Sequence, residues 1–412
     1  MSFTERVRQQ FLEVMKGAGG AEKAFRQKAW EAFEVQGLPG KSNEYWKYSA
    51  HTALTGPDWR ETLPVSTEPA MAADIRARYG AAFEIVFVVN GVPQPPCVRD
   101  FSFQARAFEA TGAALNFDDG FLSAAAAVNG GGFDLTVAEG VRVARPLLLV
   151  HVLTGEGSWG SSLNRIVLGK DAELRLAELF VSEAQVYLRT DITRVELGEG
   201  ANLNWVRAQQ ERATASYFSE VQLHLQARSL ASLTQLNCGA AWSRTSLKAD
   251  IHGERAEVAV NGLSFGRLEQ HVDQRVQVSH HAGQSTSSQL FKGVLKDKAR
   301  GILNGKIYIA RGAQKVVSSQ LNHNLLLSPG AEANTKPELE VYADDVKANH
   351  GASVGRLDEG KLFYLMSRGI SRAVSERMLA QAFTADVVMK ISSPELRRFA
   401  FANVEDLVLG GG

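Results

Sequence analysis

The chain has 412 residues, in which 45 lysine and arginine residues balance 45 aspartate and glutamate residues, so the formal net charge is zero. A balanced charge gives no overall field to attract nucleic acid or an anionic membrane, which argues against both kinds of partner. The length allows a large core and two or three domains. Residues 1–15 carry early charges and do not read as a secretory signal, and the longest apolar runs, Ile85–Val89 and Leu147–Val150, are too short to cross a bilayer. We therefore expect a soluble, cytoplasmic protein.

The two cysteines, Cys97 and Cys238, lie far apart in the sequence. Such a low count does not suit a disulfide framework and fits a reducing compartment. No Cys-x-x-Cys motif occurs, so this chain alone cannot supply four thiolates to a zinc ion or an iron–sulfur cluster. Cys97 has no histidine nearby in sequence to activate its thiol, and we interpret it as incidental. Any iron–sulfur chemistry must therefore use ligands from a partner.

Residues 1–134 are predicted to form an N-terminal helical and mixed region. Two early segments place apolar residues at helical spacing, namely Val7, Phe11, Val14 and Met15, and then Phe25, Ala29, Ala32 and Phe33. Residues 81–96 read as a buried strand with an Asn-Gly turn. Gly40-Lys41-Ser42 resembles part of a phosphate-binding loop, but Val35 stands where that loop needs a glycine and no strand precedes it, so nucleotide binding is not predicted.

Residues 135–357 are predicted to form a β-helix core. Short segments alternate apolar and polar residues, as in Ala172, Leu174 and Leu176, which is typical of strands with one buried face. A Gly-x-x-Ala element introduces several of these strands, at Gly169–Ala172, Gly198–Ala201 and Gly253–Ala256. The recurrence of such elements about every 25 to 30 residues indicates a solenoid in which each coil stacks on the previous one.

Residues 358–412 are predicted to be helical again. Ser371 is placed to cap one helix, which carries an apolar stripe of Leu379, Phe383 and Val387. Ser393-Pro394 is a second start signal, with a capping residue followed by proline at the first helical position. We expect these helices to pack against the β-helix.

Nine histidines occur, and the strand pattern predicts which of several point inward and which point outward. His224 is predicted to be solvated, His280 to point inward and His281 outward, so the adjacent pair cannot chelate one metal ion in the way that a helical pair can. His323 reads as a structural hydrogen-bonding residue. His350 precedes a glycine at a strand end, a position that by chemistry alone more often has a structural role than a ligand role.

The segment Lys336–Gly355, KPELEVYADDVKANHGASVG, gives His350 a more specific context. Together with the preceding Ser318–Asn334 and the following Asp358–Ser371, it resembles the SufD-type members of the SufB/SufD family, which are scaffold subunits of the SUF iron–sulfur cluster assembly machinery. The segment Lys41–Ser49, KSNEYWKYS, is similar to an Asn-Glu-x-Trp-Lys-Tyr element near the start of proteins of this family. The resemblance is most specific in Phe291–Ile370 and covers most of the chain.

The resemblance implies a flattened right-handed β-helix flanked by helical regions, a SufB-like partner at the C-terminal end of the β-helix, and a SufC-like ABC-type ATPase on the C-terminal helices. It also implies that His350 acts at the interface with the SufB-like partner, as a metal ligand that shares a transient iron–sulfur cluster with a cysteine of that partner. A neutral imidazole is a competent iron ligand. The family pattern has cysteine where this chain has Ala348, so no thiol from that position is present. Whether a reduced flavin binds the complex, and whether the chain forms a homodimer in isolation, stay open.

We therefore predict a cytoplasmic scaffold subunit that has no catalytic turnover of its own, with ATPase activity residing in the SufC-like partner. A SufB-like paralogue is the nearest alternative, against which the short chain and the shortage of cysteines argue. An alternative of another class is a carbohydrate-acting β-helix enzyme, which would need clustered acids in a groove. The acidic pair Asp344-Asp345 is adjacent in sequence, so its carboxylates would diverge in a strand, which disfavours that alternative.

Overall fold

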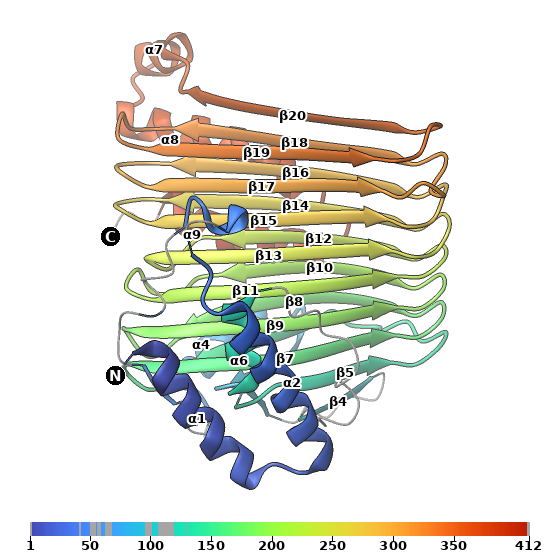
Figure 1. The fold of residues 1–412 in the computed structure, drawn as a ribbon. Coiled ribbons are helices and arrows are strands. Elements are labelled where there is room, and N and C mark those ends of the chain that lie inside the picture. Colours follow the sequence, from blue (N-terminus) through green and yellow to red (C-terminus); the bar gives the residue numbers. More distant parts are fainter. Residues whose placement is uncertain are drawn as a thin grey trace.

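The computed structural model describes residues 2–40, 43–49, 55, 59–61, 68–94, 101–105, 119–128 and 130–409. Its core is a β-solenoid in which the chain alternates between two sheets, so that each coil contributes one strand to each sheet (Figure 1). Helices lie at both ends of the chain. The predicted mainly β fold, a β-helix core flanked by helical regions, is thereby confirmed.

One sheet contains the odd-numbered strands except β3, together with β4, and we call it the odd sheet. Its strands pair in parallel from β5 to β19, while β4 pairs with β5 in antiparallel fashion and β1 pairs beside β7. The strands are β1 (Arg60–Glu61), β4 (Ser102–Ala105), β5 (Phe133–Val137), β7 (Ser158–Leu168), β9 (Tyr187–Leu197), β11 (Ser216–Leu225), β13 (Trp242–Ile251), β15 (His271–His280), β17 (Arg300–Ile309) and β19 (Glu332–Val341).

The other sheet, which we call the even sheet, contains β3 and the remaining strands. It is parallel from β2 to β20, with β3 added to β2 in antiparallel fashion. The strands are β2 (Glu84–Val89), β3 (Val92–Pro93), β6 (Leu147–Leu153), β8 (Glu173–Ser182), β10 (Asn202–Gln209), β12 (Leu230–Asn237), β14 (Glu257–Gly266), β16 (Thr286–Leu295), β18 (Val317–Leu326) and β20 (Lys347–Arg356).

The Gly-x-x-Ala element forms the turn that leads into strands of the even sheet. A Cβ atom on Gly253 would lie 1.8 Å from the backbone nitrogen of Ala227 in the previous coil, so only glycine allows this close approach. The third residue of this element, Arg255, has a positive φ of 57°, and the alanine that follows it, Ala256, is fully buried. The repeat read from the sequence therefore corresponds to one corner of each coil.

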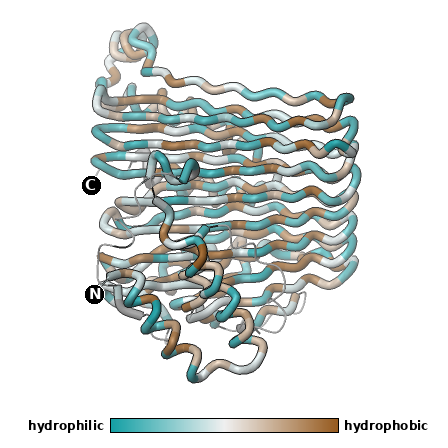
Figure 2. Tube along the Cα trace, viewed as in Figure 1, coloured by the Kyte–Doolittle hydropathy of each residue, from teal (hydrophilic) through white to brown (hydrophobic). Residues whose placement is uncertain are grey.

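Much of the space between the two sheets is filled by apolar side chains, the largest cluster of which spans most of the coils. Leu176, Trp205, Leu233 and Val260 occupy equivalent positions on four successive strands of the even sheet and all belong to this cluster. Apolar and polar residues alternate along the strands, as the changing colours of the tube in Figure 2 show. This alternation places one set of side chains between the sheets and the other set on the outer faces.

Helices cover the outer faces of both sheets. The N-terminal helices α1 (Phe3–Gly17), α2 (Gly20–Gln36) and α6 (Gly120–Ala127) form an apolar cluster with Trp159, Leu188 and Phe218 of the odd sheet. The short 3₁₀ helix η1 (Glu44–Trp46) contributes Trp46 to this cluster. The predicted N-terminal helices thus pack on the first coils of the solenoid.

The even sheet is covered by α4 (Ala72–Tyr79), α8 (Arg372–Met389) and α9 (Pro394–Leu409). The aromatic ring of Phe399 on α9 lies 5.4 Å from that of Tyr79 on α4, so a helix from the first hundred residues and the last helix meet on this face. The helix α7 (Glu359–Ser367) follows β20 and projects beyond the last coil (Figure 1). Within the part of the chain that the structure describes, no helix has the length and apolar character needed to span a membrane.

Strands on both sides of residue 134 enter the sheets, since β2 and β4 precede it in the chain. The helices that follow residue 357 return along the outer face of the even sheet. The division of the chain into regions at residues 134 and 357 stays a prediction.

Candidate functional site at the open end of the solenoid

The solenoid ends in an uncovered coil formed by β19 and β20. Each of these strands has a sheet neighbour on one side only, within the residues that the structure describes. An edge strand presents backbone N–H and C=O groups that another chain can pair with. Large apolar side chains are also exposed here, including Tyr342, which is 55% exposed, Val354 at 47% and Val341 at 40%. This open end is the part of the fold best suited to receive a partner.

His350 lies on β20 in this open coil and is exposed. It pairs in register with Gln320 of β18. No hydrogen bond or ion pair joins its imidazole to the residues that the structure describes. Ala348 precedes it on the same face of the strand and packs against the apolar cluster around Ile307 and Ala313. The imidazole of His350 is therefore free to take a ligand. Ala348, which stands where the family pattern has cysteine, contributes to packing.

The acidic pair Asp344-Asp345 lies in the turn between β19 and β20 and is exposed. The backbone carbonyl of Asp345 accepts a hydrogen bond of 2.6 Å from the backbone N–H of Lys315, and its own N–H donates to Oε1 of Gln314. The pair therefore closes the last corner of the solenoid.

The segment with the Asn-Glu-x-Trp-Lys-Tyr element packs on the outer face of the odd sheet. The indole N–H of Trp46 donates to Asp119 over 2.7 Å, and the guanidinium of Arg244 lies 4.1 Å from the centre of the indole ring. The ammonium of Lys336 on β19 lies 2.5 Å from the carboxylate of Glu44, and its hydrogen bonds to Glu338 and Glu44 raise the pKa of Lys336. The element thus connects the N-terminal region to the open end. Lys41 and Ser42, which belong to the rejected phosphate-loop interpretation, lie outside the described residues.

Histidine rings form a stack on the outer face of the odd sheet. The rings of His224 and His252 are 5.9 Å apart and those of His252 and His281 are 5.0 Å apart, with an interplanar angle of 9° in both pairs. His224, predicted to be solvated, is instead half-buried, because His252 of the next coil covers it; burial, the charge of Arg194 and the proximity of His252 lower its pKa. Among the described residues no group of three or more histidine, cysteine or acidic side chains is arranged to hold a metal ion.

His280 points inward, as predicted, and is fully buried between two serine hydroxyls. Its Nδ1 lies 2.7 Å from Oγ of Ser285 and its Nε2 lies 2.9 Å from Oγ of Ser287. His281 points outward and is exposed, as also predicted, with its Nε2 3.5 Å from a carboxylate oxygen of Asp250. The two rings therefore lie on opposite faces of the strand. His323 hydrogen-bonds through Nδ1 to Ser353 over 2.7 Å, in keeping with a structural role.

Acid is expected to destabilise the fold through His280. Burial, followed by the charge of His281, lowers the pKa of His280 from 6.5 to about 4, so at mildly acidic pH the unfolded chain binds a proton there that the folded chain does not. The resulting loss in the free energy of unfolding is about 2 kcal/mol between about pH 7 and about pH 5. Urea unfolding of the wild type and of His280→Gln at both pH values measures this, and the same pH dependence in both proteins would contradict the assignment.

Of the two cysteines, the structure describes Cys238. Cys238 packs beside the apolar cluster under the C-terminal helices, and burial raises the pKa of its thiol. A buried thiol with a raised pKa is a poor nucleophile and a poor metal ligand. Cys97 lies outside the described residues.

A buried ionic network that the sequence analysis missed lies between the two sheets. Arg207 of β10 donates through Nε to Glu178 of β8 over 2.7 Å and through a terminal nitrogen to Asp191 of β9 over 2.6 Å. His151 Nε2 lies 3.0 Å from the other carboxylate oxygen of Glu178. Burial alone would raise the pKa of Asp191, but the charges of Arg207 and His151 and the hydrogen bond from Ser162 lower it. The network joins the even sheet to the odd sheet.

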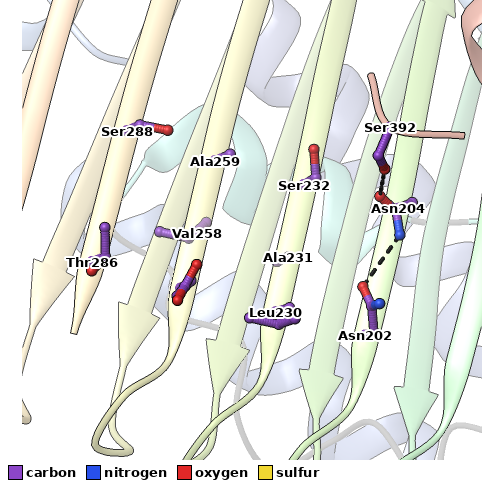
Figure 3. A pocket seen from close by; sticks show the side chains of 11 residues that line it. Asn202, Asn204, Leu230, Ala231, Ser232, Val258, Ala259, Thr286, Ser288 and Ser392 are labelled. Carbon is purple, nitrogen blue, oxygen red and sulfur yellow. Dashed lines mark hydrogen bonds between the residues drawn. The ribbon is translucent and has the colours of Figure 1, made fainter. Parts of the chain in front are cut away.

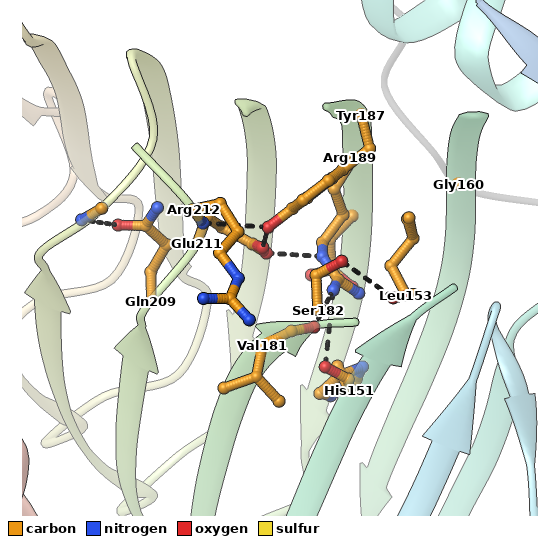
Figure 4. A network of polar contacts seen from close by, with 12 residues as sticks. His151, Leu153, Gly160, Val181, Ser182, Tyr187, Arg189, Gln209, Glu211 and Arg212 are labelled. Carbon is orange, nitrogen blue, oxygen red and sulfur yellow. Dashed lines mark hydrogen bonds and ion pairs between the residues drawn. The ribbon is translucent and has the colours of Figure 1, made fainter. Parts of the chain in front are cut away.

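A second buried group adjoins it, as Figure 4 shows. The guanidinium of Arg189 donates to Glu211 over 2.5 Å and to the carbonyl of Val181 over 2.6 Å, and the hydroxyl of Tyr187 donates to the same carboxylate. All three charged or polar side chains are nearly or fully buried. Because neither group is open to solvent, we interpret both as connections between coils and not as a catalytic site.

A shallow groove of about 290 Å³ runs over the outer face of the even sheet beside Ser392 (Figure 3). Its floor consists of small polar and apolar side chains, and Asn204 accepts a hydrogen bond of 2.7 Å from Ser392. Glu257 is the one carboxylate among the residues that line it. Glycoside cleavage by acid–base chemistry uses two carboxyl groups, so this groove lacks the pair that a carbohydrate-acting enzyme needs.

Comparison with known proteins shows which family and which relatives this chain is similar to. Residues 151–383 match the family described as SUF system FeS cluster assembly, SufBD core domain. The chain is 27% identical to the iron-sulfur cluster assembly protein SufD of Escherichia coli (strain K12), over 98% of this chain and 97% of that protein. It is 30% identical to the iron-sulfur cluster assembly protein SufD of Bacillus subtilis (strain 168), over 65% of this chain and 62% of that protein. It is 27% identical to the protein ABCI7, chloroplastic, of Arabidopsis thaliana, over 71% and 64% respectively.

A long stack of parallel coils, the last of which is uncovered among the described residues, defines the class of β-solenoid proteins. The family match covers more than half of this chain. The chain therefore belongs to the SufBD family of the SUF system for iron–sulfur cluster assembly, and the resemblance read from its sequence is confirmed.

Proposed function

We propose that this chain is the SufD-type scaffold subunit of a cytoplasmic SUF complex, in which it assists the assembly and transfer of iron–sulfur clusters without catalytic turnover of its own. Its partners are a SufB-like scaffold at the open end of the solenoid and a SufC-like ABC-type ATPase on the C-terminal helices. The ATPase activity resides in the SufC-like subunit. The SufD relatives and the SufBD core match support this assignment.

The observation that carries the proposal is the uncovered last coil. Both sheets end in strands, β19 and β20, that have a free edge within the described part of the chain. A strand edge recognises another strand through main-chain hydrogen bonds, and exposed apolar side chains beside it add buried area. A related solenoid with its own free edges, such as a SufB-like chain, is complementary to this surface.

The C-terminal helices carry a second exposed apolar surface. On α7, Phe363 is 75% exposed and Tyr364 59% exposed, and on α8 Met378 is 42% exposed. A shallow cleft of about 400 Å³ lies between the two helices beside Tyr364 and Leu379. Exposed aromatic and methionine side chains of this kind mark a binding surface for another protein. We assign this surface to the SufC-like ATPase.

The cargo of the proposed complex is a nascent iron–sulfur cluster that this chain holds jointly with the SufB-like subunit. His350 is the residue of this chain that would ligate iron, since its imidazole is exposed and has no partner in the described structure. Ala348 supplies no thiolate, so cysteine ligands come from the partner. A mixed site of imidazole and thiolate holds the cluster loosely enough to release it, which suits a scaffold. A reduced flavin, if the complex uses one, is assigned no site on this chain.

Co-expression with SufB-like and SufC-like proteins tests the proposed partners. We expect all three chains to co-purify through an affinity tag on this chain and to remain together in size-exclusion chromatography, whereas the chain expressed alone elutes as a homodimer through the same free edges. Failure of the SufB-like chain to co-purify would contradict the assignment of the open end.

A further inference from the structure

Two glutamine side chains lie below His350 in the same row of the solenoid. Gln289 of β16 pairs in register with Gln320 of β18, which pairs in register with His350 of β20. The same row begins at Val260 of β14, which belongs to the core between the sheets. Because residues at equivalent positions of parallel strands share a face, the two glutamines and His350 all face the interior of the solenoid.

The amide of Gln320 fits against a glycine on the opposite sheet. A Cβ atom on Gly305 of β17 would lie 1.4 Å from Nε2 of Gln320, so the amide occupies the space that a side chain at residue 305 would fill. The amide therefore reaches across the interior directly beneath the open coil. The glycine on β17 is what makes room for it.

Three of the four polar atoms of these two buried amides lack partners among the described residues. Gln289 and Gln320 are each 2% exposed, and within the described structure both amide atoms of Gln289 and Oε1 of Gln320 have no hydrogen-bond partner. A buried polar atom left unpaired costs about 1–3 kcal/mol. Other inward-facing polar groups of the same coils do pair, since the amide of Asn322 donates to Oγ1 of Thr335 over 2.6 Å. The unpaired atoms are therefore available to a hydrogen-bonding side chain in the same row.

We propose that Gln320 is a positioning residue for His350, and that Gln289 supports it from the coil below. The carbonyl oxygen of the Gln320 amide accepts the ring N–H of His350, which leaves the other ring nitrogen free to face the cluster at the open end. The amide N–H of Gln320 in turn donates to the carbonyl oxygen of Gln289. This inference rests on the proposed function, since it gives the iron-binding histidine its supporting contact.

The chemistry of metal-bound histidine supplies the reason. A ligating imidazole generally donates its second ring N–H to an acceptor, which fixes the tautomer and the ring orientation, and removing that acceptor lowers metal affinity about 10- to 100-fold. Gln320 offers an unpaired acceptor one coil below the imidazole. A neutral amide also leaves the imidazole neutral, which is the form that binds metal.

Two readouts test the proposal, one of which needs no cluster. In the isolated, full-length chain with ¹⁵N-labelled histidine, nitrogen chemical shifts report the tautomer of His350, and the His350→Ala variant identifies its signals. We expect a single tautomer in the wild type and a mixture in Gln320→Leu. In the complex with SufB-like and SufC-like proteins, we expect Gln320→Leu to lose its assembled cluster about tenfold faster than the wild type, and Gln320→Glu, which retains an acceptor, to restore retention.

Two further variants separate this role from a general effect on folding. Gly305→Ala leaves both side chains intact but displaces the amide, so we expect it to reproduce the effects of Gln320→Leu. Gln277→Leu removes an outward-facing glutamine that hydrogen-bonds to Ser279, and it is expected to behave as the wild type. An unchanged tautomer of His350 in both Gln320→Leu and Gly305→Ala would overturn the proposal. If the tautomer changes but His350→Ala assembles clusters normally, the contact stands and the ligand role in the proposed function fails.

Discussion

Replacement of Arg207 by methionine is expected to lower the free energy of unfolding by about 3–5 kcal/mol, because it leaves buried carboxylates without their counter-ion. Arg207 is only 3% exposed. Its guanidinium donates hydrogen bonds to Glu178, Asp191 and the hydroxyl of Ser219. Its partners lie on both sheets, so the substitution removes a connection across the interior. Methionine retains most of the apolar volume, which restricts the effect to the charge and its hydrogen bonds.

Urea unfolding followed by circular dichroism measures this loss as a lower midpoint at an unchanged slope. The matched control is Arg300→Met, since Arg300 lies on the outside of β17 with its side chain 59% exposed and its guanidinium 3.1 Å from Glu332. An exposed ion pair contributes only about 0–1 kcal/mol. Equal losses in the two variants would show that the interior network contributes no more than a surface pair.

Replacement of Ala352 by proline is expected to weaken binding of the SufB-like partner by about 10- to 100-fold while the chain stays folded. In a parallel strand, alternate residues direct their N–H groups to opposite neighbours. The N–H of Lys347 bonds to Val316 beside β18, so the N–H of Gly351 points to β18 and that of Ala352 points to the free edge of β20. Proline at residue 352 removes an edge donor without removing a bond of the sheet.

The control for this prediction is Gly351→Pro, which removes a donor that faces β18. That variant is expected to lower thermal stability, whereas Ala352→Pro is expected to unfold at the wild-type temperature. Surface plasmon resonance against the immobilised SufB-like chain measures the affinity of each. Unchanged affinity of Ala352→Pro would show that the partner does not pair with the edge of β20.

The solenoid could be predicted from the sequence because the residues that form the corner of each coil recur along the chain. The Gly-x-x-Ala corner recurs at Gly169, Gly198 and Gly253, and at each of them a Cβ atom would meet the backbone of the previous coil. Each coil therefore imposes the same local requirement, and the repeated glycine and alanine record it in the sequence. The N-terminal helix could also be predicted from the sequence, since Val7 and Phe11 of α1 are buried on the apolar face that their spacing indicated.

The ionic network could not be assembled from the sequence, because its members meet only after the two sheets stack. Asp191 belongs to the odd sheet while Glu178 and Arg207 belong to the even sheet. One signal was nevertheless present: Glu178 continues the inward-facing alternation of Leu174 and Leu176, so a charge stands where an apolar residue is expected. A charged residue on the buried face of a strand indicates a partner on another strand.

The candidate site was likewise predictable only in part from the sequence. The motif around His350 identified the residue, but its exposure and its place at the free edge follow from the fact that no coil of the described chain covers β20. The row formed by Gln289, Gln320 and His350 depends on the register between coils, which varies with the length of each turn. Register was not readable from the sequence, so the glutamines could not be connected to the histidine.

Anaerobic cluster assembly in the isolated complex tests the central claim most directly. The complex of this chain with SufB-like and SufC-like proteins is purified with wild-type protein and with His350→Ala, and the iron–sulfur absorbance is followed after addition of iron and a sulfur source. We predict that the variant still forms the complex but assembles markedly less cluster than the wild type. Equal assembly by the two complexes would contradict the role of His350 in the site.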